Sequence, residues 1–139
     1  MTDLTALAVG DELFTRTFTV DRALLVRYAG ASGDFNPIHW NERVAREVGL
    51  DGVIAHGMAT MGLAAAAVTE WAGDPGAVVD YGVRFTRPIV VPDPGEAELE
   101  VTGRVGALDA EAGTVRVDLT ARAGGVTVLA KAQAVVRPR

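Results

Sequence analysis

The side chains of this chain that are best suited to transfer a proton are an acid and an imidazole within residues 28–40. Asp34 stands five residues before His39, which is one of only two histidines in the sequence. Between them Asn36 precedes Pro37, and a proline disfavours the helical conformation for the residue before it. We therefore expect the pair to lie on a bent, irregular segment, where functional side chains are often found. A turn closed by an Asx-type hydrogen bond, with a structural histidine, is the competing interpretation.

The composition argues against several other kinds of chemistry. The sequence has no cysteine, which excludes disulfides, thiolate metal sites and cysteine nucleophiles. Asp34, His39 and His56 match no familiar zinc spacing, so we expect no metal site. Asp34 also stands where the nucleophile elbow that would begin at Gly30 needs a glycine, and there is no glycine-rich phosphate loop.

Charge and hydropathy bear on partners and location. The net charge is −5 and Lys131 is the single lysine, so nucleic acid is not an expected partner. No apolar run reaches the roughly 18 residues that a membrane span needs. The first residues lack the basic start and apolar core of a signal peptide. We expect a cytoplasmic protein that does not enter a membrane.

A second feature complements the acid and the imidazole. His56 and Gly57 stand at the start of a long apolar segment, residues 57–72, which we predict to be a buried helix. The first backbone N–H groups of a helix have no internal partner and lie at its positive end. Glycine at position 57 lets a substrate approach that backbone closely. An oxyanion site beside an acid–base pair suits proton removal next to a carbonyl, with loss or addition of a β-hydroxyl.

The order of the other elements predicts the fold class. One early strand, residues 11–19, precedes two short helices and the long helix, and strands with alternating apolar residues follow from position 78 to position 136. This order predicts one α+β domain, residues 1–139, in which an antiparallel sheet wraps around the central apolar helix. Such a sheet has an exposed edge, and dimerisation is one way to cover it.

The motif from Tyr28 through Ser32-Gly-Asp-Phe-Asn-Pro-Ile-His39, with Ala45 six residues further on, resembles the signature of the MaoC-like, (R)-specific hydratase family. Residues 55–58 (Ala-His-Gly-Met) and 81–88 (Tyr-Gly-Val-Arg-Phe-Thr-Arg-Pro) resemble its continuation. The similarity covers about residues 10–136. Within the family, the chain most resembles the catalytic β subunit of the two-subunit (3R)-hydroxyacyl-carrier-protein dehydratase of type II fatty acid synthesis. The resemblance implies the hot-dog fold.

The resemblance also implies roles for individual residues. Asp34 and His39 would be the catalytic pair, the amide of Gly57 would face a thioester carbonyl, and Asn36 would help hold the loop. His56 could touch substrate, but ordering the loop or the helix start is the role we expect for it. The implied reaction is dehydration of a (3R)-hydroxyacyl thioester, or hydration of the enoyl thioester, with no cofactor. Which of Asp34 and His39 performs each proton transfer stays open.

One position departs from the family. Some relatives carry a serine in the helix near the reaction centre, where this chain has Gly62. The hydrogen bond of that serine is then absent here or is supplied by Thr60 nearby. The small residues Gly62, Ala65 and Ala66 are compatible with a tunnel for an acyl chain and with tight packing of the helix on the sheet. We prefer the packing interpretation.

The sequence does not decide which carrier holds the acyl group or which subunit is the partner. Acyl carrier protein and coenzyme A are both anionic, so either would need basic residues, and the candidates are Arg43, Arg46, Arg84 and Arg87. Surface ion pairs are the alternative role for these arginines. The chain could form a homodimer or pair with a sister hot-dog subunit. A hot-dog thioesterase and a non-catalytic acyl-binding subunit are the competing functions.

Overall fold

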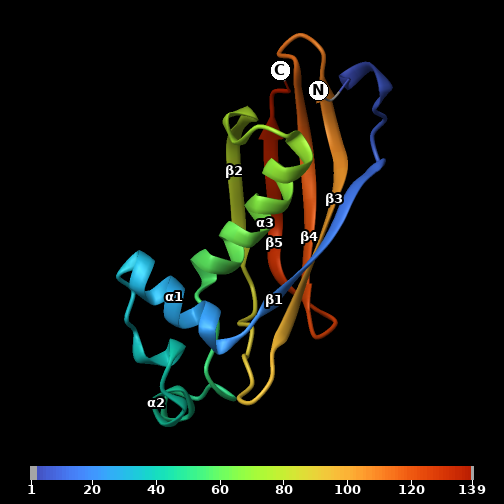
Figure 1. Cartoon of the computed structure of the whole chain (residues 1–139). Coiled ribbons are helices and arrows are strands. Elements are labelled where there is room, and N and C mark those ends of the chain that lie inside the picture. The colour runs from blue at the N-terminus through green and yellow to red at the C-terminus, as the bar shows by residue number, and fades with distance from the viewer. Residues whose placement is uncertain (1–2, 139) are drawn as a thin grey trace.

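The computed structural model, which describes residues 3–138, contains a five-stranded antiparallel sheet with one long helix against its face (Figure 1). The spatial order of the strands is β1-β3-β4-β5-β2. Their bounds are β1 (Glu12–Val20), β2 (Val78–Phe85), β3 (Ala97–Asp109), β4 (Thr114–Ala123) and β5 (Val126–Val136). The predicted α+β class with an antiparallel sheet is confirmed. Residues 1, 2 and 139 of the predicted domain lie outside the described residues.

Three α-helices accompany the sheet. They are α1 (Arg22–Ser32), α2 (Glu42–Glu47) and α3 (Gly57–Ala72), and single 3-10 turns span Leu4–Ala6, η2 (Pro37–His39) and Pro75–Ala77. Figure 1 shows α1 and α2 together at one end of the molecule, below the start of α3, and both chain ends at the other end. The Asp21 carboxylate accepts from the Leu24 N–H to cap α1, and Asn41 caps α2.

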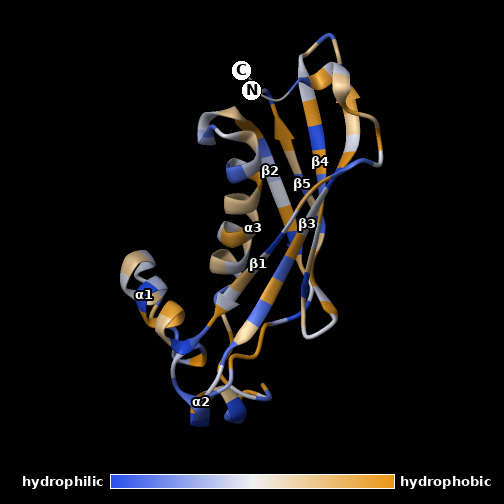
Figure 2. Cartoon of the chain, turned by 45° about the vertical axis from the view of Figure 1, so that its right-hand side comes forward, coloured by the Kyte–Doolittle hydropathy of each residue, from blue (hydrophilic) through white to orange (hydrophobic). Residues whose placement is uncertain are grey.

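Alternating apolar residues place the core between the sheet and α3. Leu99, Val101 and Val105 of β3 are buried, and their neighbours Glu98 and Glu100 are exposed. Figure 2 shows this alternation of hydrophobic and hydrophilic residues along the strands. β-Branched residues such as valine fit a pleated, half-buried surface, which is why these stretches form strands. Gly124 and Gly125, both with positive φ (57° and 77°), make the hairpin turn between β4 and β5.

Helix α3 buries one side and exposes the other. Its buried residues are Ala59, Thr60, Ala64, Ala67 and Val68. Met58, Gly62 and Ala66, spaced four apart, form an exposed line that we call the α3 outer line. The prediction that α3 is buried all round is therefore wrong, because the sheet covers only one side of the helix. The preferred packing role for Gly62 is wrong as well, since a Cβ added there would meet no atom within 4 Å.

Polar and aromatic contacts fix α3 along its length. The Tyr81 hydroxyl of β2 donates to the Met61 carbonyl at 2.8 Å, and burial raises the pKa of Tyr81 to about 12. Near the end of the helix, the Phe14 and Trp71 rings lie 6.3 Å apart. These contacts hold α3 against strands β1 and β2 of the sheet. None of the helices within residues 3–138 has the length and apolar character that crossing a bilayer demands.

Candidate active site

His39 is oriented by a main-chain carbonyl. It ends η2, is 7% exposed, and its Nδ1 lies 2.7 Å from the carbonyl oxygen of Ile54. A carbonyl oxygen only accepts, so Nδ1 carries the proton and Nε2 of the neutral ring has a free lone pair. That Nε2 atom faces the Asp34 carboxylate, with Oδ2 at 3.9 Å. His39 is therefore held in the tautomer that can take a proton at Nε2.

Asp34 is held by local turns that begin where α1 ends. Gly33 closes α1 in the left-handed conformation (φ 75°), and the Asp34 N–H then donates to the Ser32 hydroxyl at 3.1 Å. One carboxylate oxygen, Oδ1, accepts from the Asn36 N–H at 3.1 Å. The Asx-type turn weighed as an alternative thus exists, and it leaves Oδ2 facing His39. The segment is bent and irregular, as the Asn36-Pro37 pair predicts.

Asn36 and His56 both support this loop. The Asn36 side-chain oxygen accepts from the Ile38 N–H at 3.2 Å and so starts η2. His56 is 1% exposed, and its Nε2 donates to the Asp34 carbonyl at 3.1 Å. Its ring stacks on the His39 ring with centroids 3.8 Å apart and planes at 22°. His56 therefore links the start of α3 to the acid and the imidazole, and its contacts fit the ordering role expected for it.

Gly57, the first residue of α3, shares a cleft of about 280 Å³ with His39. The residues that line this cleft, which we call the His39 cleft, are His39, Ile54, Ala55, Gly57, Phe85, Thr86, Arg87 and Pro88. The side chain of His56, the N-cap residue of α3, makes no capping hydrogen bond. The free N–H groups and the positive end of the helix dipole can stabilise an oxygen that gains negative charge.

Phe85 restricts the space beside Gly57. A Cβ added to Gly57 would lie 3.1 Å from Cε1 of Phe85, which is tighter than ordinary contact. Phe85 itself is 52% exposed. Neither Phe85 nor Ile54 is among the site residues predicted from the sequence. An aromatic residue at the end of an alternating strand was the available signal for Phe85, whereas Ile54 acts through its main chain and leaves no signal in the sequence.

Potential metal ligands also meet here, although their spacing in the sequence predicted no metal site. One ligand atom each from Asp34, His39 and His56 lies within 4.8 Å of the others. The two imidazoles are stacked and nearly parallel, so their nitrogen lone pairs do not converge on one point about 2.0–2.1 Å from both, as a bound zinc requires. In addition, His56 Nε2 is occupied as a donor. The cluster fits proton transfer better than metal binding.

The four candidate arginines divide into two kinds. Arg43 pairs with Glu47 at 2.6 Å and Arg46 with Glu42 at 3.3 Å, both along α2, as in the surface ion-pair alternative. Arg87 lines the His39 cleft, and Arg84 lies elsewhere on β2. None of the ion pairs formed within residues 3–138 includes Arg84 or Arg87.

Arg22 joins the segments around the site. Its guanidinium donates to Glu42 at 2.7 Å and to the Val91 carbonyl at 2.8 Å. The Arg22 guanidinium holds the pKa of the Glu42 carboxyl below its usual value. These bonds connect α1, α2 and the chain after β2.

Thr60 does not supply the missing hydroxyl. Its side chain is buried and Oγ1 donates to the His56 carbonyl at 3.4 Å, inside the same helix. Thr60 and Gly62 are both absent from the residues that line the His39 cleft. The position at which some relatives carry serine is thus without a hydroxyl near His39.

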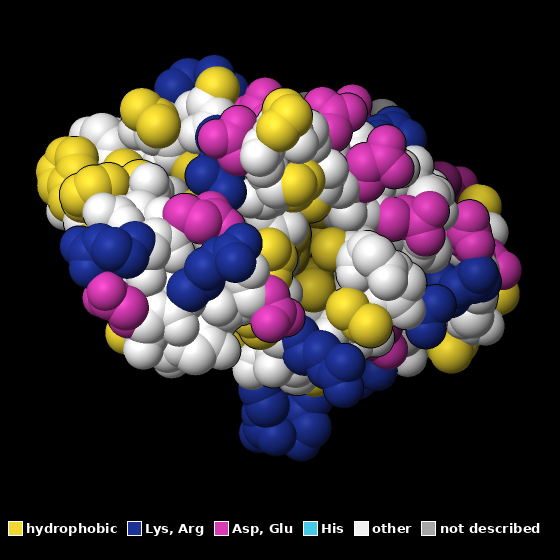
Figure 3. Space-filling view, turned by 90° about the horizontal axis from the view of Figure 1, so that it is seen from below, with side chains coloured by type: hydrophobic (Ala, Val, Ile, Leu, Met, Phe, Trp, Pro, Cys, Tyr) yellow, Lys and Arg dark blue, Asp and Glu magenta, His cyan; other side chains and the backbone are white. Residues whose placement is uncertain are grey.

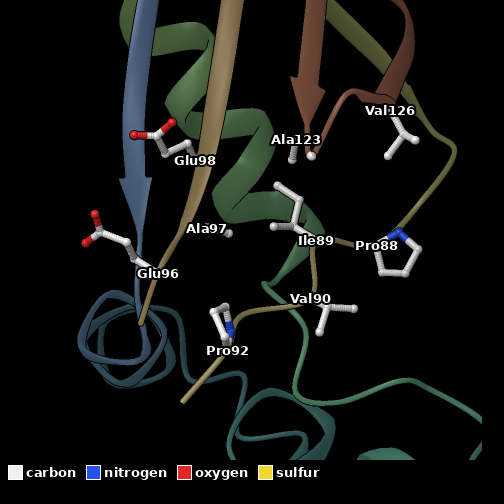
Figure 4. Close-up of a pocket in the computed structure, with 10 residues that line it drawn as sticks. Pro88, Ile89, Val90, Pro92, Glu96, Ala97, Glu98, Ala123 and Val126 are labelled. Atoms are coloured by element: carbon white, nitrogen blue, oxygen red, sulfur yellow. The ribbon is translucent and has the colours of Figure 1, made fainter. Parts of the chain in front are cut away.

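A larger cleft of about 610 Å³ lies beyond Pro88 (Figure 4). We call it the large cleft, and its lining is Pro88, Ile89, Val90, Pro92, Glu96, Ala97, Glu98, Ala123, Gly124 and Val126. Figure 3, seen from below, shows a hollow with hydrophobic side chains inside and charged side chains around it. The large cleft contains no histidine, so its only titratable groups are the carboxylates Glu96 and Glu98.

Comparison with known proteins identifies the class. The family model described as "MaoC like domain" matches residues 6–123. A solved "MaoC-like dehydratase" superposes with a TM-score of 0.94 and 43% identity over 98% of this chain and 42% of that one. The chain belongs to the MaoC-like family and has its hot-dog fold.

Two curated relatives give the resemblance more detail. The "3-hydroxyacyl-thioester dehydratase X" of Mycobacterium tuberculosis is 44% identical over 70 residues, 50% of this chain and 24% of that protein. The "(R)-specific enoyl-CoA hydratase" of Rhodospirillum rubrum is 34% identical over 88 residues, 63% of this chain and 61% of that protein. The matches thus span about a quarter and about three fifths of these relatives.

Proposed function

We propose that this chain is a hydro-lyase that interconverts (3R)-3-hydroxyacyl thioesters and 2-enoyl thioesters in lipid metabolism. The observation that carries the proposal is the Asp34–His39 pair beside the free N-terminus of α3. The Oδ2–Nε2 distance of 3.9 Å is too long for a direct hydrogen bond. An oxygen atom about 2.8 Å from both atoms fits between them, which is the position that the β-hydroxyl or the attacking water requires.

In dehydration, His39, the Gly57 N–H and Asp34 each have one role. His39 Nε2 takes the proton from the α-carbon, and the electrons of that C–H bond move toward the thioester carbonyl. The carbonyl oxygen gains negative charge and is stabilised by the Gly57 N–H and the dipole of α3. The hydroxyl, held by Asp34 Oδ2, then leaves the β-carbon and takes up the proton held by the pair, so that water and the enoyl thioester are the products. Hydration is the reverse.

The names of the relatives support this choice of reaction. One relative is a 3-hydroxyacyl-thioester dehydratase and the other an enoyl-CoA hydratase, which are the two directions of one reaction. No group beyond the protein side chains and amides takes part in the proposed steps, so we propose that no cofactor is needed. The substrate arrives as a thioester of coenzyme A or of acyl carrier protein. A cytoplasmic location is part of the same proposal.

We further propose that the active form is a pair of hot-dog subunits, either two copies or this chain and a sister subunit. Strand β2 is an outermost strand of the sheet, so one of its edges is unpaired within the described chain. Val79 of this strand is 47% exposed and Met58 of the α3 outer line is 59% exposed. A second subunit at this edge would cover both. Light scattering should give twice the 14.5 kDa chain mass for a homodimer.

The test of the function is an assay with crotonyl-CoA as substrate. We expect loss of the enoyl absorbance and formation of (3R)-3-hydroxybutyryl-CoA, with the rate unchanged after dialysis against a chelator. A thiol reagent in the same assay distinguishes the competing thioesterase, because hydrolysis releases free coenzyme A. Thiol release without hydration, or binding without either reaction, would contradict the proposal.

A further inference from the structure

A polar hollow lies on the outer face of the sheet, at its β2 edge. It has a volume of about 250 Å³ and is lined by Asp80, Gly82, Val83, Arg84, Lys131 and Gln133. The Tyr81 hydroxyl and the Phe85 ring both contact α3, so β2 directs these residues to the helix side of the sheet. Because successive side chains of a strand alternate between faces, Asp80 and Arg84 belong to the opposite face. This outer hollow is therefore separate from the His39 cleft.

An irregular backbone forms part of the outer hollow. Lys131, the single lysine of the chain, has φ 46°, the only positive φ of a non-glycine residue within residues 3–138. The pairing of β5 shifts by one residue there, since Gly82 faces Gln133 whereas Arg84 faces Ala130. A bulge of this kind changes the direction of a side chain. A left-handed lysine is also strained, and such strain is concentrated at functional sites.

The cations of the outer hollow are not neutralised by ion pairs. Neither Arg84 nor Lys131 belongs to any ion pair formed within residues 3–138. Most of the ion pairs formed there include another arginine. Asp80 is the one carboxylate in the lining, so the hollow has a formal charge of +1 in a chain of net charge −5. Gln133 adds an amide donor. Two cations and a neutral donor around a small concavity are suited to a phosphate group.

The outer hollow and the His39 cleft are lined by neighbouring residues at the end of β2. Phe85 lines the His39 cleft and follows Arg84, which lines the outer hollow. After Phe85 the chain leaves the sheet, and Arg87 is in the lining of the His39 cleft. A ligand that passes around the end of β2 thus meets Arg87 on one side of the sheet and Arg84 with Lys131 on the other.

We propose that the outer hollow binds the phosphorylated adenosine end of coenzyme A while the acyl thioester occupies the His39 cleft. This inference rests on the proposed function, because it assigns the carrier for the same reaction. The flexible arm of coenzyme A runs between the two sites around the end of β2, with Arg87 near its diphosphate. Arg84, Lys131 and Gln133 bind the terminal phosphate, and Asp80 accepts from a ribose hydroxyl. A small concave site favours a nucleotide over the broader surface of a carrier protein.

The experiment compares two substrates and two kinds of variant. Lys131→Gln and Arg84→Gln should each raise KM for crotonyl-CoA about tenfold and leave kcat unchanged. KM for crotonyl-pantetheine, which lacks the nucleotide, should not change. Arg122→Gln is the matched control, because Arg122 is an exposed arginine of β4 outside the outer hollow. The effect on crotonyl-CoA should weaken as salt is raised.

A binding measurement separates this inference from the proposed reaction. Adenosine 3′,5′-bisphosphate should bind the wild-type protein in calorimetry and bind Lys131→Gln about tenfold more weakly. If hydration proceeds but neither variant changes KM for crotonyl-CoA or the binding of the bisphosphate, the inference is wrong and the function stands. If bisphosphate binding depends on Lys131 but no hydration occurs, the site stands and the function fails. A rise in KM confined to acyl-carrier-protein substrates would also overturn the inference.

Discussion

The His39 cleft and the large cleft lie on either side of Pro88. The large cleft has the greater volume, whereas the His39 cleft has the groups that can transfer a proton. The large cleft has about 610 Å³ and the His39 cleft about 280 Å³. The smaller one has an oriented imidazole with Asp34 beside it and a free helix N-terminus. The larger one has a mostly apolar lining with two carboxylates, Glu96 and Glu98. Oriented groups that can exchange a proton, and not volume, are therefore the basis for placing the proposed reaction in the His39 cleft.

The largest expected effect concerns the imidazole itself. His39→Ala removes the proposed base, and because general base catalysis contributes roughly 10²–10⁴-fold, we expect kcat to fall by about three orders of magnitude. Steady-state hydration of crotonyl-CoA measures this, with circular dichroism as the check on folding. As a control in the other cleft, Val126→Ala should retain kcat within about twofold. Equal losses of kcat in both variants would contradict the placement of the proposed reaction in the His39 cleft.

A smaller loss is expected at the start of α3. Gly57→Ala places a methyl group 3.1 Å from Cε1 of Phe85. The new methyl group also lies beside the amide proposed to receive the thioester carbonyl. We expect kcat/KM to fall by roughly 10–100-fold, somewhat less than the loss of one oxyanion donor. Gly62→Ala is the matched control in the same helix, where the new methyl group meets no atom within 4 Å.

The Gly62→Ala control carries a prediction about stability. Alanine in place of glycine inside a helix should raise the free energy of unfolding by about 1 kcal/mol and leave the rate of hydration intact. Thermal melting measures this gain. A fall in Tm together with a monomer mass in light scattering would show instead that the contact proposed for a second subunit at Met58 extends along the α3 outer line to Gly62.

His56 should matter less than His39, because it acts through the position of other groups. His56→Ala removes the donor to the Asp34 carbonyl and the ring that stacks on His39. A misplacement of about 1 Å can cost about 10²-fold, so we expect kcat to fall by about 10–100-fold with KM little changed. His56→Gln, which retains a donor, should recover part of the loss. A loss as large as that of His39→Ala, without recovery in the glutamine variant, would assign His56 a direct role.

The smallest effect concerns Tyr81 and stability at alkaline pH. Burial raises the pKa of Tyr81 to about 12 in the folded protein, from 10.0 for an exposed tyrosine. The folded state therefore holds the phenol proton more tightly, and this contribution to stability is complete below about pH 10 and is lost as the pH rises through 10 to 12. Tyr81→Phe should show a smaller loss between pH 9 and pH 11 in urea denaturation. Equal losses in both proteins would contradict the burial of this hydroxyl.

Structural elements that depend on short stretches of sequence could be predicted well. Asp21 and Asn41 cap helices where their side chains predict caps, and the Gly124-Gly125 turn lies where two adjacent glycines predict a hairpin. The motif around Asp34 and His39 predicted both the family and the meeting of these two side chains. These features depend on contacts between residues close together in the chain, so a short stretch of sequence is enough to specify them.

Features that depend on distant segments were predicted less well. The apolar character of α3 suggested burial on all sides, yet Met58 and Gly62 are exposed because the sheet covers only one side. The bond that orients His39 comes from the main-chain carbonyl of Ile54, which any residue type supplies. The Arg84–Lys131 hollow depends on the pairing of β2 with β5, and no local pattern in the sequence reports that register.

The most direct test of the central claim compares two carboxylates that differ mainly in location. Asp34→Asn alters the acid beside His39, and Glu98→Gln alters an acid of the large cleft. In hydration of crotonyl-CoA, we predict that Asp34→Asn lowers kcat by about three orders of magnitude, within the range of acid–base contributions, and that Glu98→Gln leaves it unchanged. Turnover by folded Asp34→Asn at the wild-type rate would contradict the assignment of the reaction to the Asp34–His39 pair.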